Sequence, residues 1–252
     1  TVQTHLSSLR GHEENLKQRL PEVEKKWHSR RDELNRSSSR LHSLKELEAQ
    51  FAGFGQGVRT LMKDAGLRSR FSGVLADAIV TPPELESALE SALAERLQCI
   101  LCPDDHDAFL ALEFLKTHKG GRAGIALPLE LHAAAPPSLA GVTPLLEQVQ
   151  TVGPFAGLVR NLLATVMLVD DIGGALRLAR QHPALIFVTR SGDMVEQGGI
   201  ISGGSGEQVG AGLIHKKREI RELDLAVARL EEETAVLGKQ CDDLRRQVQE
   251  VA

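Results

Sequence analysis

The feature that most constrains this 252-residue sequence is a repeating apolar pattern at both of its ends. From Leu213 to Val251, mostly apolar residues recur at alternating spacings of four and three. The same spacing runs from Leu6 to Phe51, where ten of fourteen positions are apolar. A period of 3.5 residues kept over such lengths predicts coiled-coil helices rather than isolated surface helices.

The two helical ends are expected to pair with each other, because a lone helix cannot bury its apolar seam. The chain leaves along one arm and returns along the other, so the pair should be antiparallel. If Phe51 faces Leu213, the numbers of paired seam residues sum to 264; a shift of one heptad is the main alternative. Pro21 should kink or restart the first helix.

Charged residues mark the same division of the chain. Residues 1–50 carry 18 of them and residues 213–252 carry 17, against 29 in the 162 residues between. We therefore expect coiled-coil arms at 1–52 and 213–252, and a compact body divided into subdomains 53–148 and 149–212.

Composition excludes several classes of function. A net charge of -4 argues against a globally basic nucleic-acid binder, and 3% aromatic residues argue against base stacking as a main activity. The sequence has no run of 18 apolar residues and no apolar signal-peptide core, so we expect no membrane partner. Three cysteines cannot form a dense disulfide framework, which favours a cytoplasmic location.

The body alternates short apolar runs with helical stretches and repeats itself. Helices are expected at 84–97, 104–118, 155–164 and 173–182, and strands at 97–102, 122–129, 165–171 and 184–189. A shift of 67 residues lays Leu101 on Leu168 and Ala108 on Ala175. This pattern predicts an α+β body made of two related mixed α/β subdomains.

A glycine-rich segment at 191–212 ends the body and leaves three interpretations open. It could be a flexible loop, or a phosphate site at 198–212 in a ligand-binding or enzymatic domain, although no phosphate-loop motif with its lysine is present. The paired glycines that bracket Ile200 and Ile201 favour a third interpretation, a flat β edge that another chain approaches closely.

The order of these segments resembles the hinge of the SMC (structural maintenance of chromosomes) proteins, most closely the bacterial condensin-type chromosome segregation members. The most specific stretch is FVTRSGDMVEQGGIISGGS. The resemblance implies two pseudo-repeated α/β subdomains forming a hinge at the tip of an antiparallel intramolecular coiled coil. It also implies homodimerisation, in which strands of two hinges pair through Gly198, Gly199, Ile200, Ile201, Gly203 and Gly204.

The same resemblance implies that this fragment is not an enzyme and holds no cofactor. In the family, ATP and Mg²⁺ bind at head domains outside this segment, and condensin-type accessory subunits bind outside it too. A cytoplasmic, nucleoid-associated location is expected.

A basic cluster at the junction of body and coil suggests weak, sequence-independent DNA contact, as in the family. The alternative is a solvated helix face whose cations pair with neighbouring glutamates. The cluster consists of Lys216, Lys217, Arg218, Arg221, Arg59, Lys63, Arg68 and Arg70.

Other chemistry-bearing residues favour structural interpretations. Cys99 and Cys102 form a C-x-x-C motif, but a zinc site needs two further ligands. Asp104 and Asp171 stand where helices begin and are expected to cap them. Asp193 is expected to act in a turn. No catalytic residue and no metal ligand is assigned.

Overall fold

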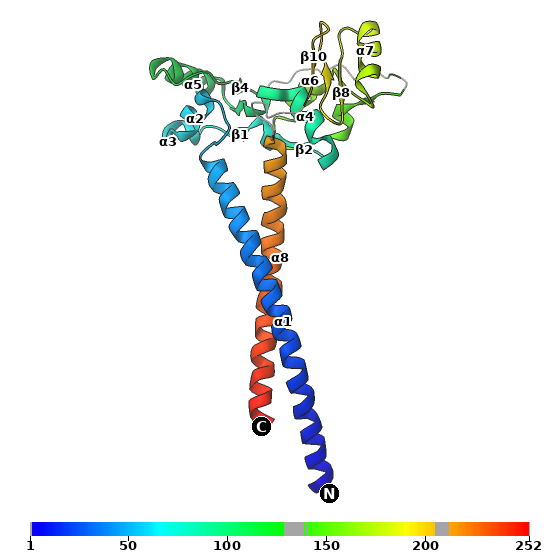
Figure 1. Cartoon of the computed structure of the whole chain (residues 1–252). Helices are drawn as coiled ribbons and strands as arrows, with labels where there is room; N and C mark the ends of the chain where they lie inside the picture. Colours follow the sequence, from blue (N-terminus) through cyan, green and yellow to red (C-terminus); the bar gives the residue numbers. More distant parts are fainter. Residues whose placement is uncertain (1, 129–138, 140, 205–211, 252) are drawn as a thin grey trace. The chain divides into compact units, whose positions relative to one another are not determined.

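The computed structural model describes residues 2–128, 139, 141–204 and 212–251, which form two compact units (Figure 1). One unit, the coil, comprises Thr1–Glu46 and Glu219–Ala252; the other, the body, comprises Leu47–Arg218. The helices are α1 (Val2–Ala49), α2 (Gln56–Lys63), α3 (Ala65–Arg68), α4 (Glu86–Leu93), α5 (Asp105–Thr117), α6 (Ala156–Leu163), α7 (Ile172–Gln181) and α8 (Leu213–Val251).

The strands are short, and 3-10 helices separate several of them. The strands are β1 (Gly73–Val74), β2 (Ile79–Val80), β3 (Ile100–Leu101), β4 (Ile125–Ala126), β5 (Thr143–Pro144), β6 (Gln150–Thr151), β7 (Val166–Val169), β8 (Ile186–Thr189), β9 (Met194–Val195) and β10 (Ile201–Ser202). The 3-10 helices are η1 (Leu75–Ala78), η2 (Pro83–Leu85), η3 (Ala94–Gln98) and η4 (Leu145–Gln148).

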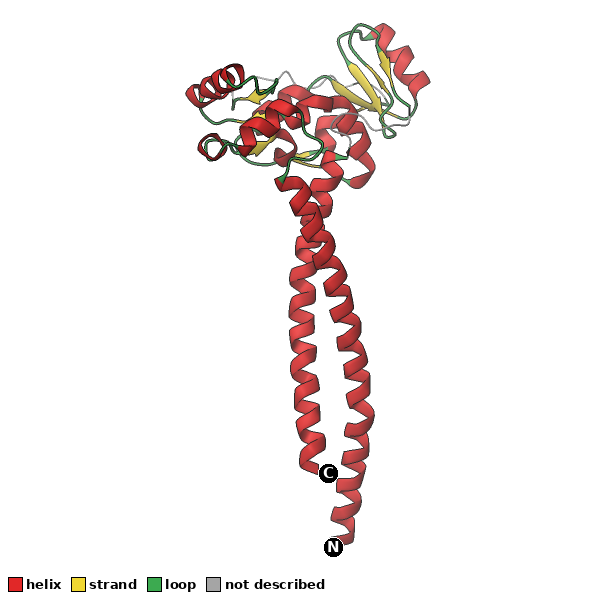
Figure 2. Ribbon diagram, turned by 60° about the vertical axis from the view of Figure 1, so that its left-hand side comes forward, coloured by secondary structure: helices red, strands yellow, loops and turns green. Residues whose placement is uncertain are grey.

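In the coil, α1 and α8 lie side by side and antiparallel, as Figure 2 shows. Leu41, Leu44 and Ile220 form a buried cluster against which Leu223 and Val227 pack. Cross-helix ion pairs flank the seam, joining Arg40 to Glu219, Lys45 to Asp224 and Glu24 to Arg245.

These ion pairs identify the register. Their residue numbers sum to 259, 269 and 269, five below or above 264. This is the offset expected of residues that flank a seam whose paired positions sum to 264, whereas a slipped heptad would shift every sum by about seven. Of the two registers left open by the sequence, the structure has the one whose paired positions sum to 264.

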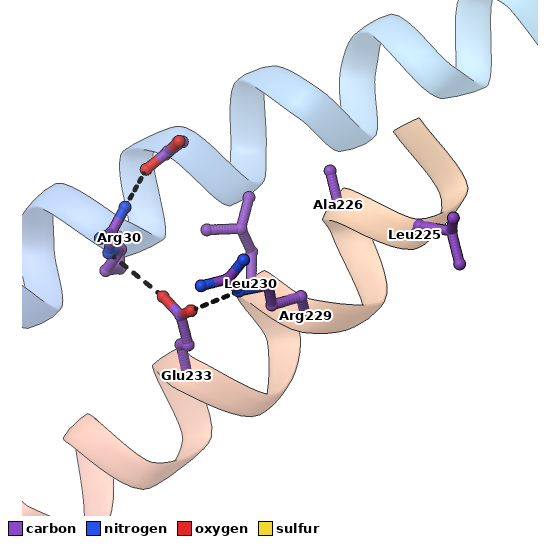
Figure 3. A pocket seen from close by; sticks show the side chains of 7 residues that line it. Arg30, Leu225, Ala226, Arg229, Leu230 and Glu233 are labelled. Carbon is purple, nitrogen blue, oxygen red and sulfur yellow. Dashed lines mark hydrogen bonds and ion pairs between the residues drawn. The ribbon is translucent and has the colours of Figure 1, made fainter. Parts of the chain in front are cut away.

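Polar residues interrupt the seam where Arg30 approaches α8. Arg30 Nε lies 3.2 Å from Glu233 Oε2, and Arg229 Nε lies 2.9 Å from Glu233 Oε1 (Figure 3). The neighbouring Thr234 is buried and donates its hydroxyl to the Leu230 carbonyl. The polar groups of Arg30, Glu233 and Thr234 therefore have their partners within the coil.

Of the two predicted effects of Pro21, a kink or a restart of the first helix, the restart is wrong. Helix α1 continues through this residue from Val2 to Ala49. A proline within a helix removes one backbone hydrogen bond, and packing of the apolar seam on both sides of Pro21 offsets that loss.

The body consists of two repeats with the same order of elements. Apart from η2 and η3, which flank α4 in the first repeat, the first runs β1, η1, β2, α4, β3, α5, β4 and the second runs β5, η4, β6, α6, β7, α7, β8. In each, the first strand pairs antiparallel with the third, which pairs parallel with the fourth. The second repeat begins at β5, close to the predicted subdomain boundary at 148, which stays a prediction.

The repeats differ at one sheet edge. The first sheet has the order β1-β3-β4, whereas the second extends through a hairpin to β10-β9-β8-β7-β5. The repeats join through β2 and β6, where Ile79 pairs with Thr151. Side chains alternate along β7, so Leu168 enters a core shared by both repeats and Met167 enters a smaller core beneath α7.

Candidate functional site

Strand β10 forms an open edge of the five-stranded sheet. It pairs with β9 on one side, and no strand in the described part of the chain pairs with its other side. The side chains of Ile200 and Ile201 are 61% and 57% exposed. An exposed strand edge bearing large apolar side chains is a template for pairing with another chain.

The glycines around β10 have internal roles that the sequence pattern alone did not separate. Gly198 and Gly199 have φ values of 85° and 86°, and the Gly199 N–H donates to the Glu196 carbonyl at 3.1 Å. They therefore form the turn between β9 and β10, where positive φ favours glycine. Gly204, at φ 110°, follows the strand.

Asp193 fixes the end of the edge strand. Its carboxylate accepts hydrogen bonds from the Ser191 hydroxyl at 3.0 Å and from the Gly204 N–H at 3.2 Å. A Cβ atom at Gly203 would lie 2.2 Å from Asp193 Oδ1, so only glycine fits there without displacing the carboxylate. The predicted turn role of Asp193 is confirmed.

A second group of charged side chains lies within the body near the start of α8. Lys217 forms ion pairs with Glu48, at the end of α1, and with Asp77 of η1. Burial disfavours the charged ammonium, but the Asp77 and Glu48 carboxylates outweigh it and raise the pKa of Lys217. Asp77 also accepts a hydrogen bond from the Val74 N–H at 2.9 Å.

Two acids of α4 hold the same turn. Glu86 accepts from Arg218 Nε at 2.5 Å, and its other oxygen lies 3.1 Å from His215 Nδ1. Burial favours neutral Glu86, but hydrogen bonds from Arg218 and His215 lower its pKa. Sequence reasoning missed this role, although acids four residues apart share one helix face.

Glu90 caps α8 from a separate element. Its carboxylate accepts from the Gly212 N–H at 2.7 Å and from the Ile214 N–H at 2.9 Å. A helix begins with unpaired N–H groups and a positive dipole end, so a carboxylate there is stabilising. The amides of Gly212 and Ile214, at the end of the glycine-rich segment and just after it, are therefore already bound to an acid.

Comparison with known proteins assigns the body to a family. Residues 68–179 match the family model described as "SMC proteins Flexible Hinge Domain". This chain contains an SMC hinge domain. A solved structure is described as an asymmetric dimer of the Geobacillus stearothermophilus SMC hinge domain. It superposes on this chain with a TM-score of 0.80 at 26% sequence identity, and the match covers 93% of this chain and 98% of that one.

Two relatives extend the similarity into the arms. The chromosome partition protein Smc of Myxococcus xanthus is 34% identical over 215 residues, which is 80% of this chain and 18% of the relative. The Smc of Bacillus subtilis is 29% identical over 231 residues, which is 86% of this chain and 19% of the relative. The chain thus spans about a fifth of the length of these relatives.

The match also bears on catalysis. It lies in the hinge, a dimerisation domain, and this supports the prediction that the fragment is not an enzyme.

None of the helices in the described part of the chain has both the length and the apolar character of a membrane span.

The structure separates the predicted basic cluster of the hinge. Lys217 and Arg218 are held by acids, as described above, and Arg70 pairs with Asp107. The Arg68 guanidinium lies 5.6 Å from the centre of the Phe51 ring. The exposed members in the body are Arg59, Lys63, Arg68, Arg70 and Lys216, whereas Arg221 belongs to the coil.

The remaining candidates have structural roles. Asp104 accepts from the N–H groups of His106 and Asp107, and Asp171 from that of Gly174, so both cap helices as predicted. Burial raises the pKa of the Cys99 and Cys102 thiols. Among the described residues, no three His, Cys, Asp or Glu side chains gather as a metal site would require.

Proposed function

We propose that this hinge joins two copies of the chain by pairing the free edge of β10 with a strand of the second copy. The observation that carries the proposal is the open edge itself, at which Ile200 and Ile201 are exposed to solvent. Pairing would bury both side chains and satisfy the unpaired backbone groups of the edge. The solved relative described as a hinge dimer supports it.

The partner strand in this proposal is β4 of the second copy. Strand β4 ends the first sheet at the position where β9 and β10 extend the second. A β10 edge placed on β4 would lengthen the shorter sheet as the hairpin lengthens the longer one. Because each copy has one edge of each kind, two copies close on each other with two equal contacts.

Solution mass tests the dimer. Sedimentation of the chain over a range of concentrations should give a species near twice 27.4 kDa. The Ile200→Lys, Ile201→Lys double variant should remain folded by circular dichroism and become monomeric, because two ammonium groups cannot be buried in a strand pair. Val152→Lys, at a residue 46% exposed elsewhere in the body, is the matched control. A monomeric parent chain would overturn the proposal.

These variants suit the structure better than substitutions of Gly199 and Gly203. Gly199 has a positive φ, and a side chain at Gly203 would collide with Asp193. Either change would strain the β9–β10 hairpin itself. The two isoleucines are exposed to solvent, so their replacement leaves the fold of the hairpin intact.

For the whole protein, we propose the role of the named relatives, chromosome partition, with the hinge linking two long coiled arms. ATP and Mg²⁺ would bind at head domains outside this segment, as would accessory subunits. A cytoplasmic, nucleoid-associated protein is consistent with this role.

We also propose weak DNA contact through the exposed cations Lys216, Arg59, Lys63 and Arg68. Fluorescence anisotropy with two unrelated duplexes should give equal affinities that fall steeply as salt rises. Arg59→Glu and Lys63→Glu together should abolish binding, while Arg218→Gln should change affinity little because Glu86 already holds that guanidinium. Salt-independent binding, or none at low salt, would contradict it.

The phosphate-site alternative fits the geometry poorly. Asp193 accepts the Gly204 N–H, and Glu90 accepts those of Gly212 and Ile214. Both carboxylates already accept the N–H groups that a phosphate would bind, and their negative charge would repel a phosphate. Residues 205–211 of that predicted site lie outside the described part of the chain.

A further inference from the structure

Helix α5 carries an apolar face that the rest of the described chain leaves open. Phe109 is 58% exposed and Leu112 is 42% exposed, and both stand on the same side of the helix, three residues apart. Ala108, Ala111 and Leu115 face the core instead.

The second repeat shows what covers the equivalent face. Helix α7 packs against both β8 and β9, and its Leu176 and Ala179 lie against the core that contains Val195 of β9. By the order of elements, α5 corresponds to α7 and β4 to β8. The first sheet stops at β4, so Phe109 and Leu112 have no strand of their own sheet equivalent to β9 beneath them.

Strand β10 offers side chains of the right kind. Ile201 pairs with Val195, so it projects from the sheet face that α7 covers, and Ile200 projects from the opposite face. Whichever direction β10 takes along a β4 edge, one of these two neighbours must therefore point to the α5 side.

We propose that Phe109 and Leu112 form an apolar seat that receives an isoleucine of β10 from a second copy of this chain. This inference rests on the proposed dimer and adds residues from a different element to its interface. The strand edges supply hydrogen bonds that any sequence could make. The seat supplies side-chain selectivity, because a polar or charged strand gains nothing from it.

One single-site variant tests the seat, and a second, outside it, serves as the control. Phe109→Arg should weaken dimerisation about tenfold to a hundredfold in sedimentation, the range for an interface anchor. Its fold should persist, because Phe109 is already mostly exposed. Leu225→Arg, at a coil residue 76% exposed, is the matched control and should leave the dimer unchanged.

Mixing distinguishes the seat from a general loss of stability. Phe109→Arg and Ile200→Lys, Ile201→Lys chains each have both contacts damaged when they pair with themselves. In a one-to-one mixture, the intact isoleucines of the first chain meet the intact seat of the second, so one undamaged contact returns and a mixed dimer should form.

A Phe109→Arg chain that dimerises like the parent overturns the seat while leaving the proposed dimer standing. Failure of the mixture to form dimers, with both variants folded, also overturns it. If the parent chain itself is monomeric, the proposed function fails first and the seat fails with it.

Discussion

The Glu90 carboxylate accepts the backbone N–H of Ile214 at 2.9 Å, so α4 supplies the cap of a helix to which it is not adjacent in sequence. The same carboxylate accepts the Gly212 N–H. The first turn of α8 is therefore fixed by the body.

Replacing this cap should lower stability. We expect Glu90→Ala to reduce the free energy of unfolding by about 1–2 kcal/mol, since it removes a capping acceptor. Urea denaturation followed by circular dichroism measures the change. Glu95→Ala, at an exposed position of η3, is the control, and an equal loss in both variants would refute the capping role.

The Glu86 ion pairs predict a pH dependence. The folded-state pKa of Glu86 lies below the ordinary value of 4.5, so its stabilisation is present above pH 4.5 and is lost as pH falls through the folded-state pKa. The stability difference between the parent and Glu86→Gln should therefore be full at pH 6 and shrink below pH 4.5. Denaturation midpoints across this range measure it. A difference that stayed constant, or that Glu84→Gln reproduced, would count against the assignment.

Gly203 should tolerate no side chain while Asp193 is present. We expect Gly203→Ala to destabilise the chain by about 1–3 kcal/mol because its Cβ would collide with the carboxylate. In an Asp193→Ala background the same substitution should cost much less, since the two residues are in contact. Thermal unfolding of the four proteins completes this cycle, and additive costs would exclude the clash.

Gly11 presents the opposite case. It lies within α1, with open space where a Cβ atom would be added. Gly11→Ala should stabilise the helix by about 0.5–1 kcal/mol through reduced backbone entropy in the unfolded chain. A lower melting temperature would show that the α1 backbone differs from the helix described here.

The coil register can be checked chemically. Cysteines at Leu34 and Leu230, whose numbers sum to 264, should form a disulfide under mild oxidation. Cysteines at Leu34 and Leu237, the pair of a slipped heptad, should not. The parent chain with its buried Cys241 serves as the background. Cross-linking of the second pair alone would place the register one heptad away.

Features that depend on residues close in sequence or on a long periodic pattern were predicted better than features that depend on contacts between distant segments. The caps at Asp104 and Asp171 depend on residues close in sequence, and they were predicted. The long periodic pattern predicted the antiparallel coil but left two registers open, one heptad apart. The continuity of α1 at Pro21 was not predicted, because the proline's local preference was outweighed by contacts along the arm.

The rest of the site depends on contacts between distant segments. Lys217 and Arg218 stand in a run of cations, which predicted a surface for DNA, but Asp77 and Glu86 meet them from more than a hundred residues away. The glycine pairs were predicted to lie at the dimer interface, which stays a prediction. The structure adds that Gly198 and Gly199 form a turn and that Gly203 lies against Asp193. No local pattern distinguishes these uses.

The position of Lys217 links the ends of two helices that are far apart in sequence. From its place near the start of α8, this residue pairs with Glu48, in the last turn of α1, and with Asp77 of η1. The end of α1 and the start of α8 therefore share one charged side chain within the body, and a substitution of Lys217 would alter the attachment of both helices together.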